Sequence, residues 1–126
     1  VQDIKDKTSI VSEMQGMVDE ARDLVINDKY DEFGKLLHQN WLLKKSISDV
    51  VSTAEIDSLY DHALKNGALG GKLLGAGAGG FMLFFCAEDK KEELSKIFDT
   101  KMVVPFEMSE LGSTIVYYEE KDYGVL

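Results

Sequence analysis

The sequence is poor in the residues that cross-link or interrupt a chain. Its 126 residues include one cysteine, Cys86, and one proline, Pro105. A single cysteine excludes an internal disulfide, which fits a reducing compartment, and we expect a cytoplasmic protein. No apolar run approaches the roughly 20 residues that a membrane-spanning helix needs, and no signal-peptide pattern opens the chain. The sequence therefore predicts no association with a membrane.

Positive charge is also scarce. Lysine and arginine number 14 against 23 aspartates and glutamates, which gives a net charge of −9. An acidic chain repels polyanions, so nucleic acid is not expected as a partner. The two histidines, His38 and His62, have no cysteine or histidine at ligand spacing, so no metal site is predicted. The hydrophobic content of 44% is sufficient for one core, and we expect a single domain over residues 1–126.

The first half of the chain has the apolar periodicity of helices. Apolar residues recur at helical spacing over Ile10–Val25, over Lys29–Ser46 and again over Ile56–Leu64. Ser52 and Glu55 have the spacing of a capping box, in which each side chain accepts a hydrogen bond from a free backbone N–H. These patterns predict three consecutive helices.

The periodicity changes after Asn66 and Gly67, a pair that is typical of a helix end because glycine takes the left-handed conformation without steric cost. The short segment "GGKLL", residues 70–74, is expected to be extended. The continuous apolar run "FMLFFC", residues 81–86, is typical of a strand covered on both faces or of a central strand. The two segments predict a hairpin around a glycine-rich loop.

A fourth helix and two further strands are predicted beyond the hairpin. Asp89 and Glu92 are candidates to cap the helix, and strands are expected at 103–108 and 114–119, joined by residues 110–113. The buried side of the helix would consist of Leu94, Ile97 and Phe98. The order is three helices followed by β-β-α-β-β. This predicts an α+β fold in which a single antiparallel sheet has helices packed on one face.

The stretch "GGKLLGAGAGG" invites two nucleotide-binding interpretations, and both fail. A P-loop needs a lysine after the glycines, whereas Lys72 precedes them. Gly75, Gly77 and Gly80 match the dinucleotide fingerprint, but that motif opens a helix, and here an apolar strand begins at Phe81. Two interpretations remain: a plain flexible turn, or a loop whose backbone N–H groups approach an anion closely. Four glycines within six residues favour the second, because a plain hairpin needs one or two.

At this point the residues resemble a known family. "GGKLLGAGAGGFMLFF" is similar to the C-terminal glycine-rich motif of the GHMP kinases. The flanking "HQNWLLKKSIS" and "STAEIDSLYDHALKNGAL" resemble the branch that phosphorylates sugars or sugar phosphates at the anomeric hydroxyl, especially the D-glycero-D-manno-heptose 7-phosphate kinases. Ala78 is a departure, because this branch often has glycine there.

The resemblance implies a two-domain enzyme that uses ATP and Mg²⁺. The N-terminal domain of the family carries the main nucleotide loop and handles Mg²⁺ and the substrate hydroxyl, and this chain has no such loop. Residues 1–126 would form the C-terminal domain, with a ferredoxin-like fold, and would be inactive alone. The chain begins at Val1, which suggests a piece of a longer protein. By the resemblance, the ATP-facing residues are Lys72, Gly75, Ala76, Gly77, Ala78, Gly79 and Gly80, with no catalytic residue or metal ligand in this chain.

The remaining candidates for a binding role are Lys44 and Lys45. They could hold the phosphate of a sugar-phosphate substrate, or they could be ordinary exposed lysines. The expected partners are the chain's own N-terminal kinase domain and the small-molecule substrate, and a homodimer is compatible with the sequence. The alternative to a kinase half is a free-standing ferredoxin-like ligand-binding or regulatory domain. The upstream sequence would distinguish the two.

Overall fold

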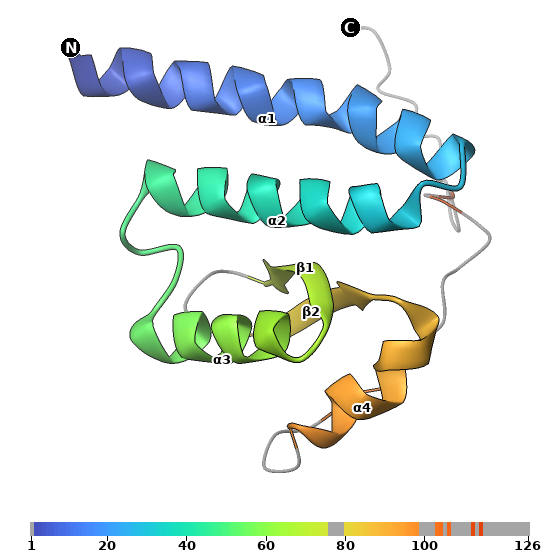
Figure 1. Ribbon diagram of the computed structural model, residues 1–126. Helices are drawn as coiled ribbons and strands as arrows, with labels where there is room; N and C mark the ends of the chain where they lie inside the picture. The colour runs from blue at the N-terminus through green and yellow to red at the C-terminus, as the bar shows by residue number, and fades with distance from the viewer. Residues whose placement is uncertain are drawn as a thin grey trace, which may run out of the picture.

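The structure is a computed structural model that describes residues 2–75 and 80–98, together with the isolated positions 103, 104, 106, 112 and 114. Four helices and two strands are present in these ranges (Figure 1). The strands expected at 103–108 and 114–119, and the connection between them, lie outside the continuous ranges. In chain order the elements are α1 (Gln2–Ile26), α2 (Tyr30–Ile47), α3 (Ala54–Lys65), β1 (Ala68–Leu74), β2 (Phe81–Cys86), a 3₁₀ turn (Glu88–Lys90) and α4 (Lys91–Lys96).

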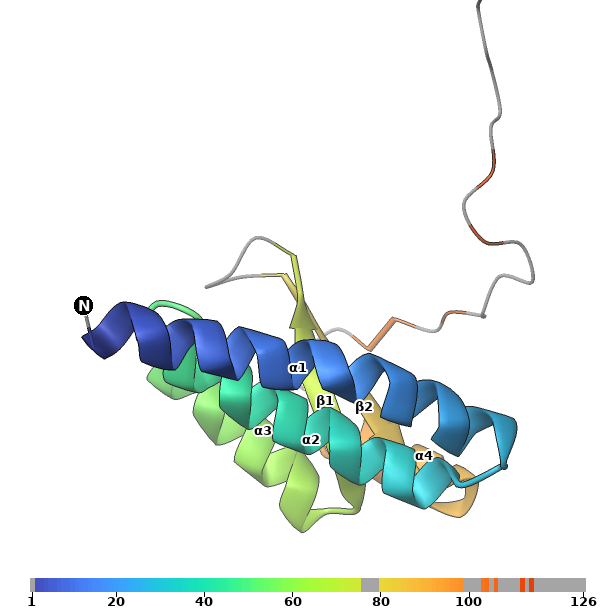
Figure 2. The ribbon, with the colours of Figure 1, turned by 90° about the horizontal axis from the view of Figure 1, so that it is seen from above.

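The helices are arranged around the hairpin in layers. α2 packs against α1 on one side and against β1 on the other, and α3 also contacts β1 (Figure 1). From above, the hairpin runs steeply across the direction of α1 and α2 (Figure 2). The α+β class predicted from the sequence is therefore confirmed, while the ferredoxin-like topology stays a prediction. No helix among the described residues is long and apolar enough to cross a bilayer.

The helix boundaries differ from the predicted ones where the sequence signal is polar. α1 begins at Gln2, well before Ile10, because its first turns consist mainly of polar helix-forming residues that carry no apolar stripe. The predicted capping box at Ser52 is wrong. The cap of α3 is Thr53, whose hydroxyl accepts a hydrogen bond from the Ile56 backbone N–H at 3.2 Å. Ser52 instead donates to a carboxylate, as described below.

The predicted end of α3 is observed, whereas the predicted caps of α4 are not. The predicted stop after α3 is confirmed, since Gly67 has a φ of +104°. The predicted caps of α4, Asp89 and Glu92, are wrong. A 3₁₀ turn precedes that helix, and its cap position is Lys90, which makes no side-chain capping bond.

The hairpin pairs β1 with β2 in antiparallel register, from Ala68 opposite Cys86 to Leu74 opposite Phe81, with an irregularity between Ala68 and Gly70. Within the described residues β2 pairs with β1 alone. The burial on both faces that was expected for β2 is not observed there. Its residues are half-buried, and Phe81 at its start is 60% exposed.

Two buried clusters form the core. The first joins Trp41, Tyr60 and Leu73, which come from α2, α3 and β1, and Trp41 is only 2% exposed. The second lies further from the glycine loop along the hairpin and contains Ala63, Ala68 and Leu94. The hairpin is therefore fixed at both of its ends by packing against helices.

Candidate functional site

The candidate site lies at the end of the hairpin where β1 passes into the glycine loop. The described residues at the base of this loop are Gly75 and Gly80, with φ values of +117° and +123°, a region that disfavours every residue with a Cβ. A Cβ on Gly80 would also lie 2.2 Å from the carbonyl oxygen of Leu74. The two strands therefore approach so closely at the loop base that only glycine fits at position 80. The intervening residues predicted to face ATP, Ala76, Gly77, Ala78 and Gly79, lie outside the described residues.

Lys72 provides a positive charge on the strand that enters the loop. Its side chain is exposed, and it makes no hydrogen bond or ion pair with any described residue. Side chains alternate along a strand, so Lys72 shares one face of β1 with Leu74, while Leu73 faces the core. An ammonium group three positions before Gly75, with no charged partner among the described residues, suits binding of an anion.

Apolar side chains flank the loop on the same face. Leu74 and Phe81 are paired in register across the loop base and are 39% and 60% exposed. The sequence had suggested buried positions for the strand that begins at Phe81. The structure instead presents an exposed aromatic ring beside the candidate site.

The two lysines of "WLLKKSIS" have different environments. Lys45 forms an ion pair with Asp57 of α3, with 2.5 Å between Nζ and Oδ1. Ser52 donates a hydrogen bond to the same oxygen at 2.8 Å. Mainly because of the hydrogen bond from Lys45, the pKa of Asp57 lies below its ordinary value, so this carboxylate is charged at neutral pH. Lys44 has no pairing partner among the described residues.

A part-buried polar pair near the hairpin was not anticipated from the sequence. The Tyr60 hydroxyl is 2.9 Å from Nδ1 of His38, and the two rings are stacked with centroids 5.6 Å apart. Burial raises the pKa of Tyr60 to about 12, partly opposed by a hydrogen bond from the Gly71 backbone. Residues 38 and 60 are on different helices, and no local pattern in the sequence relates them.

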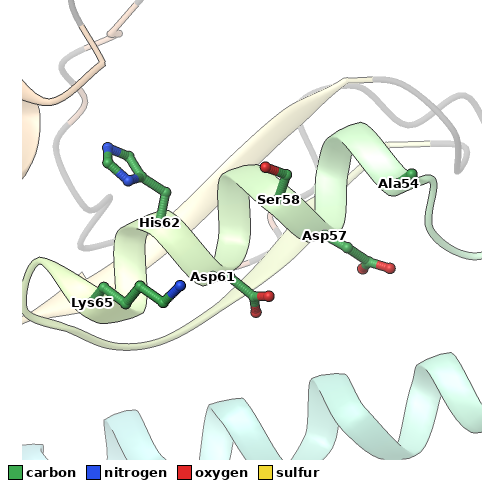
Figure 3. A pocket seen from close by; sticks show the side chains of 6 residues that line it. All are labelled: Ala54, Asp57, Ser58, Asp61, His62 and Lys65. Atoms are coloured by element: carbon green, nitrogen blue, oxygen red, sulfur yellow. The ribbon is translucent and has the colours of Figure 1, made fainter.

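A surface depression along α3 is a different feature. It has a volume of about 510 Å³. Asp57 and Asp61 point to one side of the helix, whereas Ser58 and His62 point to the other (Figure 3). Two carboxylates make this depression a poor site for a phosphate. The described residues also contain no group of three or more acidic, His or Cys side chains placed to hold a metal ion.

Comparison with known proteins assigns most of the chain to one family. Residues 21–103 match the family "GHMP kinases C terminal", a span that contains α2, α3, the hairpin and α4. The chain is 45% identical over 67 residues to a D-glycero-alpha-D-manno-heptose 7-phosphate kinase of Campylobacter jejuni, covering 53% of this chain and 20% of that protein. It is 31% identical over 93 residues to a mevalonate kinase of Thermococcus gammatolerans, covering 70% of this chain and 27% of that protein.

The chain is also similar to a more distant relative. The chain is 26% identical over 83 residues to a bifunctional fucokinase/GDP-fucose pyrophosphorylase of Arabidopsis thaliana, covering 66% of this chain and 8% of that protein. The chain thus spans about a quarter or less of the length of these relatives. Because the family match extends over more than half of the chain, this protein belongs to the GHMP kinase C-terminal domain family.

Proposed function

We propose that this chain is the C-terminal part of an ATP-dependent kinase and that its hairpin contributes the glycine loop to the phosphoryl-transfer cleft. The observation that carries the proposal is the match to the kinase family over a segment that contains Lys72, Gly75 and Gly80. The restricted geometry of Gly75 and Gly80 supports it, because both positions require glycine on conformational grounds.

The residues at the loop base suit a role in positioning ATP. Phosphoryl transfer depends mainly on alignment of the reactants and on neutralisation of the charge on the transferred group. Lys72 supplies a positive charge that is paired with no described residue, and the absence of side chains at Gly75 and Gly80 lets the backbone approach a phosphate closely. Neither feature supplies a base or a metal ligand. We therefore assign Mg²⁺ and proton transfer to a preceding domain and expect this chain to be inactive alone.

The acceptor we propose is a sugar phosphate, with heptose 7-phosphate the first to test and the anomeric hydroxyl as the site of transfer. The support is the 45% identity to the heptose 7-phosphate kinase, compared with 31% for the mevalonate kinase. Lys44 remains a candidate to contact the sugar phosphate. Lys45 is a weaker candidate, because Asp57 already neutralises its charge.

The proposal is tested by measuring ADP release by the full-length protein with ATP, Mg²⁺ and one acceptor at a time. We expect turnover with heptose 7-phosphate and much less with mevalonate or fucose. Preferential turnover with mevalonate would retain the kinase but reject the sugar-phosphate acceptor. Absence of turnover with every acceptor would reject the kinase function. The 126-residue chain is assayed in the same way. Turnover above background would contradict the expectation that it is inactive alone.

A further inference from the structure

We propose that Tyr60 is a positioning residue for the glycine loop and that it acts through its hydrogen bond to His38. This inference rests on the proposed function, because a loop position matters for catalysis only if the loop takes part in it. Tyr60 is on α3 and is only 3% exposed.

The ring of Tyr60 contacts the elements that border the loop. It is stacked on Trp41 of α2 with ring centroids 5.7 Å apart, and it lies 5.8 Å from the ring of Phe84 on β2. It also shares the first core cluster with Leu73 of β1, and Met82 of β2 packs against that cluster. Leu73 and Met82 are each one residue from the strand ends at the loop. The cluster around Tyr60 therefore anchors both ends of the loop.

The hydroxyl adds a directional constraint to this packing. It lies 2.9 Å from Nδ1 of His38, and which of the two groups donates the hydrogen bond depends on the histidine tautomer. This bond links α3 to α2 at the residue whose backbone nitrogen lies against Gly70 of β1.

The close contact of Gly70 with α2 leaves β1 little freedom to move. A Cβ on Gly70 would lie 2.1 Å from the carbonyl oxygen of Gly34 and 2.8 Å from the backbone nitrogen of His38. The strand is therefore in contact with α2 at Gly70, next to the residue of α2 that is hydrogen-bonded to Tyr60. Lys72 and Gly75 lie further along the same strand and at its end, so a shift at this point changes the position of the charge and of the loop base together.

The first test measures the position of β1 independently of activity. In the full-length protein, Tyr60→Phe removes the hydroxyl but keeps the ring, and amide hydrogen exchange is followed over residues 70–74. We expect faster exchange in this segment, whereas Leu94→Val, which alters the other core cluster, should leave it unchanged. Equal exchange in Tyr60→Phe and wild type would overturn the proposal.

The second test separates positioning from stability. Tyr60→Phe should lower kcat and raise the KM for ATP, with a fall in kcat/KM of at least about fivefold, because misplaced groups align the phosphates poorly. Leu94→Val should shift the unfolding midpoint by about as much as Tyr60→Phe does, but it should not lower kcat/KM. His38→Leu should resemble Tyr60→Phe, and the double variant should be no worse than either single one, because both remove the same link.

The outcomes distinguish this inference from the proposed function. Wild-type kinetics in Tyr60→Phe, or an equal loss in Leu94→Val, would overturn the positioning role and leave the kinase function intact. A wild-type protein that phosphorylates no acceptor would reject the proposed function. In that case hydrogen exchange would still decide whether Tyr60 fixes the position of β1. The catalytic effect proposed for Tyr60 would be rejected together with the kinase function.

Discussion

Gly34 of α2 and Gly70 of β1 pack directly against each other, so that a Cβ on Gly70 would lie 2.1 Å from the Gly34 carbonyl oxygen. The obstacle is the backbone of a buried residue of α2, which cannot move aside without displacing the helix. This contact explains a glycine that does not belong to the loop. It also brings the strand that carries Lys72 into close contact with α2.

We predict that Gly70→Ala destabilises the domain by about 2 kcal/mol or more, because the added methyl group has no space and the helix must shift. Urea unfolding of the variant and the wild type measures the effect. Gly16→Ala is the matched control. Gly16 lies in α1 with nothing within 4 Å of its Cβ position, so this variant should be at least as stable as wild type. Equal stability of Gly70→Ala and wild type would contradict the observed packing.

Gly80→Ala is predicted to lower the free energy of unfolding by about 1–2 kcal/mol or more, because alanine disfavours a φ of +123°. The clash with the Leu74 carbonyl oxygen adds to this cost. Gly16→Ala again controls for the change from glycine to alanine. If the two variants were equally stable, the close approach of the strands at the loop base would be wrong.

Tyr60 should resist ionisation. Its pKa is raised to about 12 by burial, so the neutral hydroxyl is favoured in the folded protein. A raised folded-state pKa contributes stability that is present below the ordinary value of 10 and is lost as the pH rises towards 12. The tyrosinate absorbance of wild type minus that of Tyr60→Phe should therefore show a transition near pH 12. A difference transition near pH 10 would indicate an exposed hydroxyl.

The Lys45–Asp57 pair predicts a small effect in the acid range. The pKa of Asp57 is lowered from its ordinary value of 3.8, so its contribution to stability is present above that value and is lost as the pH falls through the folded-state pKa. Both side chains are partly exposed, which limits the contribution to about 1 kcal/mol or less. Asp57→Asn should be less stable than wild type at neutral pH, and the difference should shrink in acid. A difference that is independent of pH would show that the pair contributes nothing electrostatic.

Much of the fold could be predicted from local patterns. Apolar periodicity indicated three helices, and Asn66-Gly67 marked the end of the third, because a left-handed glycine is a local requirement. The hairpin followed from two short extended segments around glycines. The start of α1 was missed because its first turns are polar. The exposure of Phe81 could not be predicted, because an apolar run does not show which strands and helices cover it.

The candidate site was predictable only in part. Lys72 and the glycines could be found because they are close together in the sequence. The Tyr60–His38 hydrogen bond spans 22 positions in the sequence. The need for glycine at position 70 comes from its contact with Gly34 on α2, a much earlier helix. Such contacts depend on how the elements pack, which no local pattern specifies. The neutralisation of Lys45 by Asp57 was missed for the same reason, since the two residues lie on different helices.

The most direct test of the central claim is the ATP turnover of the full-length protein when Lys72 is changed. With heptose 7-phosphate as the acceptor, Lys72→Gln should lower kcat/KM for ATP by about tenfold or more, because the proposed function places this charge near the phosphates of ATP. Lys35→Gln, which removes an exposed charge from α2, is the control and should retain wild-type turnover. Equal turnover in the two variants, or no phosphorylation of any acceptor by the wild-type protein, would contradict a role for this hairpin in phosphoryl transfer.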